Sequence, residues 1–159
     1  MTSLDGIGQW NTGNVLYMSN MFAENTSLQK PDIGTWDTSS IQDRASMFWK
    51  ATSLASLEGI GAWNTSKVVD LGCAFCDSTK LTELDLGDWD TSKVINMGYA
   101  FAGTESLRTL NLRNWSVKNI ISSDEDPGDD EDDCNVVCAD RPTYIEFGPT
   151  LRESTLGSQ

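Results

Sequence analysis

The sequence predicts an α/β fold, a right-handed solenoid of about four turns with parallel strands on one wall and short helices on the other. Five of the six tryptophans are separated by 26, 27, 26 and 26 residues, and a fixed period of this length is typical of stacked repeats. Phenylalanine and leucine recur on the same spacing, so stacked copies would share one continuous core. We therefore expect one column of five rings, formed by Trp10, Trp36, Trp63, Trp89 and Trp115.

The strand wall is predicted from the residues before the later tryptophans. Leu84 and Leu86, like Leu110 and Leu112, alternate with polar residues, as in a strand with one buried face. We expect these two segments to pair in parallel. The helical wall is predicted over 15–22 and 94–101, where apolar residues recur every three or four positions.

A polar ladder follows the tryptophans, because Asp or Asn and then Thr come directly after each of the first four. These residues suit turns and caps within each repeat. As a stacked polar face they are also the candidate ligand-binding residues. The set is Asn11, Thr12, Asp37, Thr38, Asn64, Thr65, Asp90 and Thr91.

One position departs from the repeat pattern. Arg44 occupies the place held by Met18, Leu71 and Met97 in the other repeats. Since a charged group is costly to bury, we expect this segment to rotate or the guanidinium to reach the surface.

Residues 81–101 run LTELDLGDWDTSKVINMGYAF. This stretch resembles the repeats of the BspA-like leucine-rich-repeat surface proteins, and the likeness extends over roughly residues 3–121. The resemblance implies a leucine-rich-repeat-like solenoid in an extracellular or cell-surface protein that takes part in recognition or adhesion. We predict no cofactor.

The charge divides the chain into a repeat region, 1–121, and an acidic linker with a tail or cap, 122–159. The net charge is −13, from 24 Asp and Glu against 11 Lys and Arg. Residues 121–159 hold 11 of the acids and 2 of the bases. The run 124–133 lacks the ligand spacing of an EF-hand, so a solvated linker is favoured over a calcium site. Residues 143–147 alternate like one more strand.

The four cysteines form two close pairs. Four thiolates suffice for a zinc site, but Cys73 and Cys76 stand where other repeats have Asn, Ser, Ala or Trp, so we interpret them as ordinary small residues. Cys134 and Cys138 are the better candidates for a disulfide, because a tail without a core gains from a covalent link. We predict no metal site.

The composition excludes several function classes. The chain has no histidine, which removes His-based triads and His-ligated metals, and its acidity opposes nucleic-acid binding. The sequence contains no stretch of about 18 apolar residues, so membrane insertion is not predicted. The amino terminus lacks the basic and apolar regions of a leader peptide. We predict no enzyme activity.

Two functions remain. The first is a non-catalytic module that recognises a protein or glycan. The alternative is a structural or scaffolding subunit of a larger assembly, which docks through the acidic tail and an open amino-terminal end. That end would expose Leu4, Ile7 and Val15.

Overall fold

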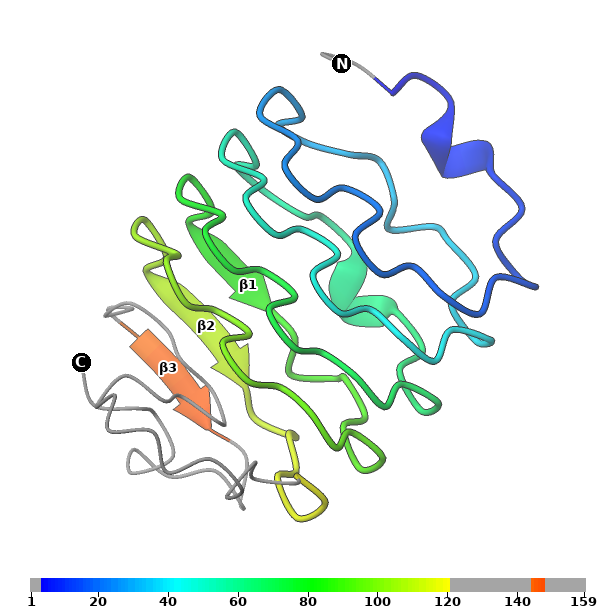
Figure 1. Ribbon diagram of the computed structural model, residues 1–159, viewed down its shortest axis with the longest axis vertical. Coiled ribbons are helices and arrows are strands. Elements are labelled where there is room, and N and C mark those ends of the chain that lie inside the picture. Colours follow the sequence, from blue (N-terminus) through cyan, green and yellow to red (C-terminus); the bar gives the residue numbers. More distant parts are fainter. Residues whose placement is uncertain (1–3, 121–143, 148–159) are drawn as a thin grey trace.

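The computed structural model describes residues 4–120 and 144–147. Figure 1 shows the repeats lying side by side along the long axis of the molecule. We number them first (4–28), second (29–55), third (56–81), fourth (82–107) and fifth (108–120). The regular elements are two short 3₁₀ helices, η1 (Ile7–Gln9) and η2 (Ile60–Ala62), and three strands, β1 (Glu83–Asp85), β2 (Thr109–Leu112) and β3 (Tyr144–Phe147).

The three strands form one parallel sheet in the order β1-β2-β3. Leu84 lies opposite Leu110 in β1 and β2, and Leu110 lies opposite Ile145 in β3. The predicted parallel pairing of the two leucine segments is therefore confirmed, and the segment expected to form a strand at 143–147 does so at Tyr144–Phe147.

The predicted fold class is wrong. The described residues contain no α-helix, and regular strand is confined to three segments of three or four residues. The α/β solenoid of about four turns with a wall of short helices is therefore not what 4–120 and 144–147 form. Successive β-turns, joined to their neighbours by isolated parallel bridges, occupy the places where helices were expected.

The backbone in these turns explains why no helix forms. Residues with positive φ recur at equivalent places, for example Asn20 at 58°, Ser46 at 55° and Cys73 at 54°. A left-handed residue interrupts a right-handed helix. The N–H groups of Met18 and Phe22 donate to carbonyl oxygens of the second repeat, at 3.0 and 2.9 Å. These donors therefore bond between repeats, whereas a helix would use them internally.

The predicted tryptophan column is confirmed. The ring centroids of consecutive members lie 6.1 to 6.4 Å apart, and their planes differ by 3° to 11°. The indole N–H of each tryptophan after Trp10 donates to a main-chain carbonyl in the previous repeat. The acceptor is the Ile or Leu that stands three residues before the tryptophan of that repeat. For Trp89 the acceptor is Ile60, at 2.8 Å. The column thus joins repeats both by ring contact and by hydrogen bonds.

A second aromatic column runs beside the first. Phe22, Phe48, Phe75 and Phe101 stack with centroids 5.4 to 5.6 Å apart, and all are buried. Apolar side chains of every repeat pack around both columns in one core cluster. Stability therefore depends on contacts between repeats, as in other repeat proteins.

Arg44 lies inside this core. Its side chain does not reach the surface as expected, since the residue is only 1% exposed. The guanidinium carbon lies 4.7 Å from the ring centroid of Trp63 and 5.4 Å from that of Trp89. Nη2 donates to the Asn64 carbonyl at 3.3 Å, whereas Nε and Nη1 have no hydrogen-bond partner among the described residues.

The burial of Arg44 predicts an unusual pH dependence. Desolvation lowers the pKa of its guanidinium to about 9, well below its usual value. Between the folded and unfolded pKa values the unfolded chain binds one more proton than the folded chain, so stability rises with pH. Relative to an Arg44→Met variant, the unchanged protein should therefore gain up to about 1.4 kcal/mol of unfolding free energy for each pH unit above 9. Urea unfolding of both proteins from pH 8 to 10.5 measures this difference, and a difference that stays constant with pH would contradict the prediction.

Candidate functional site

The threonines of the predicted polar ladder are buried. Thr12, Thr38, Thr65 and Thr91 are between 1% and 4% exposed. Each hydroxyl donates to a main-chain carbonyl of the next repeat, at 2.9 to 3.1 Å. The structure aligns these four residues as the spacing predicted, but their hydroxyl groups link repeats and are not accessible to a ligand.

The acidic and amide members of the ladder are exposed. Asn11, Asp37, Asn64 and Asp90 each accept a hydrogen bond from the main-chain N–H two residues later, which is the Asx-turn geometry. Hydrogen bonds from Ser39 and Ser92 lower the pKa values of Asp37 and Asp90; the side-chain hydrogen bond has the largest effect in each case, and the main-chain hydrogen bond has the next largest. These side chains form the accessible part of the predicted ladder, and each already accepts a hydrogen bond from its own turn.

The role of the threonine hydroxyls can be tested at Thr65. A Thr65→Val variant keeps the shape of the side chain but leaves the Asp90 carbonyl without its donor at 3.1 Å. We expect the free energy of unfolding to fall by about 1 to 2 kcal/mol, measured by urea unfolding. The matched variant Thr109→Val, at an exposed position of β2, should change it by less than about 0.5 kcal/mol. Equal effects would contradict the assignment.

The predicted docking residues are less accessible than expected. Ile7 is only 2% exposed, and its carbonyl accepts the indole N–H of Trp36, so the prediction of an exposed Ile7 is wrong. Leu4 and Val15 are partly buried against the core. The exposed apolar residues of the first repeat are Trp10, Leu16, Tyr17 and Met21, at 52%, 43%, 67% and 37%.

The interpretation of Cys73 and Cys76 as ordinary small residues is also wrong, because the two form a disulfide across one turn of the third repeat. The Cα atoms are 4.8 Å apart, within the usual range for a disulfide. The predicted pair Cys134 and Cys138 lies outside the described residues.

A groove of about 660 Å³ lies between the third and fourth repeats, a size typical of ligand sites. One side is the segment 56–62, which includes η2. The floor is formed by β1 and β2, with the side chains of Glu83, Asp85, Thr109 and Asn111. No sequence argument pointed to it.

Two glycines shape this groove. Gly59 has a φ of 79°, a conformation that favours glycine. It begins η2, so no strand of the third repeat pairs with β1. Gly61 packs against the fourth repeat, since a Cβ at this position would lie 2.7 Å from the Asp85 carbonyl oxygen. The repeats therefore touch at Gly61 and diverge before it.

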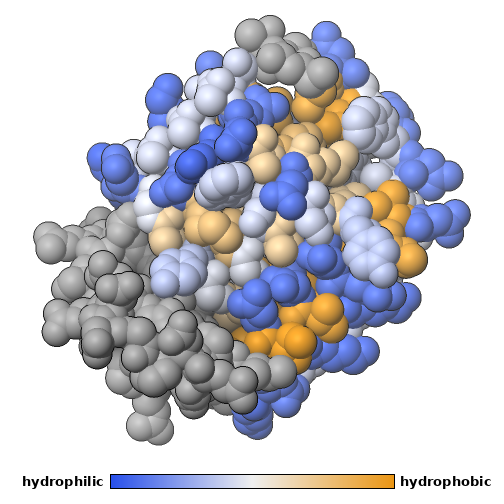
Figure 2. Space-filling model, viewed as in Figure 1, coloured by the Kyte–Doolittle hydropathy of each residue, from blue (hydrophilic) through white to orange (hydrophobic). Residues whose placement is uncertain are grey.

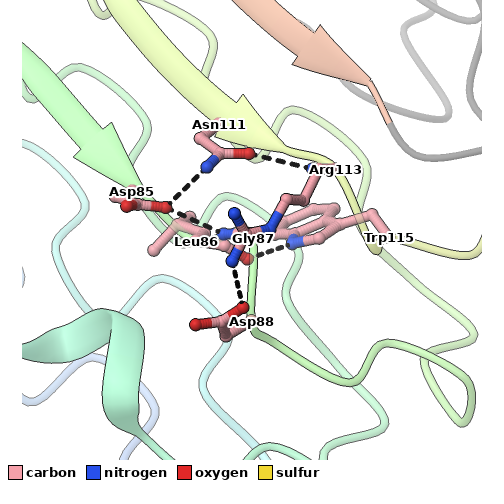
Figure 3. A network of polar contacts seen from close by, with 7 residues as sticks. All are labelled: Asp85, Leu86, Gly87, Asp88, Asn111, Arg113 and Trp115. Carbon is pink, nitrogen blue, oxygen red and sulfur yellow. Dashed lines mark hydrogen bonds and ion pairs between the residues drawn. The ribbon is translucent and has the colours of Figure 1, made fainter.

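A polar network holds the floor of the groove in place (Figure 3). Asp85 Oδ1 accepts hydrogen bonds from the Gly87 N–H at 3.2 Å and from Asn111 Nδ2 at 2.9 Å. Arg113 of the fifth repeat forms an ion pair with Asp88. These contacts fix two of the carboxylates that line the groove.

A related groove of about 460 Å³ lies between the first and second repeats. It is lined by Asp5 and Gly6 next to η1, and by Asp32 on the opposite side. Asp5 and Gly6 correspond to Glu58 and Gly59 at a spacing of 53 residues. The grooves thus recur once for every two repeats.

A third feature is an apolar wall, by which we mean Leu16, Val69, Ile95, Tyr17 and Tyr99. Hydrogen bonds between main-chain groups join residues 16, 42, 69 and 95 in sequence across four repeats, so Val69 and Ile95 are immediate neighbours. The exposed fractions of the five residues run from 38% to 67%. On the face seen in Figure 2, apolar side chains lie in patches between polar ones.

No group of three or more Cys, Asp or Glu within 4–120 and 144–147 has the geometry to hold a metal ion. Arg44, the ionisable group most changed by burial, is enclosed by the core. The accessible chemistry is that of hydrogen bonding, apolar contact and negative charge.

These features define a protein of stacked 26-residue repeats with two shallow grooves. Its sequence matches the family model described as "Mycoplasma protein of unknown function, DUF285" twice, over residues 3–57 and 54–125. The chain belongs to this family. The first match spans the first two repeats and the second spans the third to the fifth, and each contains one of the grooves. Searches among curated proteins and among solved structures find no match.

Proposed function

We propose that this chain is a non-catalytic protein-interaction module of the BspA-like type, acting in recognition or adhesion at the cell surface or outside the cell. The observation that carries the proposal is the apolar wall. Each of its five large side chains is exposed, at 38% to 67%, and Val69 and Ile95 lie next to each other; clustered exposed apolar residues mark interaction surfaces. Repeat proteins commonly bind their partners over extended surfaces.

Two further observations support an extracellular setting. The Cys73–Cys76 disulfide suits an oxidising compartment, because thiols are kept reduced in the cytosol. The repeat sequence resembles surface proteins. Among the described residues, no helix has the length and apolar character to cross a membrane.

Photo-crosslinking tests the proposed function. A benzophenone amino acid at Ile95 of the full chain should give a discrete adduct when the protein meets cells or secreted material of its source. Val69→Asp should remove that adduct, because a charge next to the crosslinker disrupts apolar contact. The same amino acid at exposed Glu105 serves as the control. Equal adducts at both positions, or none at Ile95, would overturn the proposal.

A structural subunit is the second candidate, and one observation favours it. Trp10 and Met21 are 52% and 37% exposed, whereas their counterparts in the later repeats, such as Trp36 and Met47, are 5% and 1% exposed. Docking through these residues would be apolar and should resist salt. Sedimentation velocity should then show an assembly at high ionic strength that a Trp10→Ser, Met21→Ser variant loses. A monomer under all conditions excludes this candidate.

A further inference from the structure

The groove between the third and fourth repeats exposes one edge of the sheet. The Thr82 carbonyl accepts hydrogen bonds from the N–H groups of Arg108 and Thr109, at 2.8 and 3.4 Å, and the Leu86 N–H donates to the Asn111 carbonyl at 3.0 Å. Alternate residues of a parallel strand direct their main-chain groups to opposite sides, so those of Glu83 and Asp85 point away from β2, toward 56–59. The N–H groups of Glu83 and Asp85 make no hydrogen bond outside the sheet among the described residues.

An unpaired polar side chain lies in the same place. Ser56 lines the groove, and its hydroxyl oxygen is buried without a hydrogen-bond partner among the described residues. Buried polar groups are nearly always paired. Because the Ser56 hydroxyl oxygen has no access to solvent, the unused groups left for the main chain of an extended segment are the two main-chain N–H groups.

The charge of the lining selects the side chains of such a segment. Glu58, Glu83, Asp85 and Asp88 all line the groove. No lysine or arginine lines it. Arg113 pairs with Asp88, whereas Glu58 and Glu83 have no ion-pair partner in the described chain. The site is complementary to a positively charged ligand.

We propose that this groove binds an extended, basic segment of a partner protein. Main-chain carbonyls of the segment accept hydrogen bonds from Glu83 and Asp85, and its lysine or arginine side chains pair with Glu58 and Glu83. The inference rests on the proposed function as an interaction module and adds the class of partner. It concerns a surface separate from the apolar wall.

Fluorescence anisotropy with the full chain tests the proposal. The probe is a labelled peptide of alternating lysine and valine, and the comparison peptide replaces lysine by glutamate. A Glu58→Gln, Glu83→Gln variant should weaken binding of the lysine peptide at least about tenfold. The control variant Glu24→Gln, Glu105→Gln removes the same charge at exposed positions outside the groove and should leave binding unchanged. The glutamate peptide should not bind.

Three results would overturn the proposal. They are no binding of the lysine peptide, equal weakening in both variant pairs, and displacement of the probe by spermine as effectively as by unlabelled peptide. Equal weakening would indicate only long-range charge, and displacement by spermine would indicate a site for cations without main-chain recognition. If the peptide fails while the adduct at Ile95 forms, the groove proposal falls and the interaction module stands. If both fail, the proposed function falls too.

Discussion

Replacement of Phe75 by alanine should lower the free energy of unfolding by about 3 to 5 kcal/mol. Phe75 is 1% exposed and stacks between Phe48 and Phe101 at 5.6 and 5.4 Å. Removing the ring opens a cavity in the middle of the column and breaks contacts with the repeats on both sides. Urea unfolding followed by tryptophan fluorescence measures the change.

The matched control for Phe75→Ala is Ile95→Ala, at a residue that is 42% exposed. It should cost less than about 1 kcal/mol, because surface truncations leave no cavity. Phe75→Leu should recover most of the loss, since apolar replacements of similar volume are tolerated. A loss as large for Ile95→Ala would mean that the columns do not dominate stability.

Arg44→Met should stabilise the protein by about 1 to 4 kcal/mol, the range found when buried charges are replaced by apolar residues of similar size. Two nitrogens of the guanidinium have no hydrogen-bond partner within the described part of the chain, and burial lowers the pKa of Arg44 to about 9. Met18 and Met97 occupy the equivalent place in other repeats, and both are buried. Methionine therefore fits this position without the cost of desolvating a charge.

The control for this variant is Arg108→Met, at an exposed position, which should change stability by less than about 0.5 kcal/mol. Urea midpoints at pH 7 compare the two variants, with the slope of the transition checked for constancy. Destabilisation by Arg44→Met would show that the contacts with Trp63 and Trp89 outweigh the cost of burying the charge.

The candidate sites differ in how far the sequence revealed them. The spacing of Thr12 and its counterparts predicted that these residues align. It did not predict which way each side chain faces, and therefore did not predict that the hydroxyl groups are buried. The groove gave no signal in the sequence, since it arises where Gly59 begins η2 and leaves one edge of β1 unpaired. Glycine at this position was visible in the sequence, but its φ of 79° was not.

Which residues stack follows directly from the amino-acid sequence. A 26-residue period places each tryptophan and phenylalanine over its counterpart, because identical apolar positions bury best against one another. The course of the backbone between them depends on contacts with the neighbouring repeats. The pattern of Val15, Met18 and Phe22 suits a helix, but hydrogen bonds to the neighbouring repeat and left-handed residues such as Asn20 produce turns with the same buried face. Apolar spacing fixes which side chains are inside, whereas the direction of the N–H groups depends on a partner strand distant in the chain.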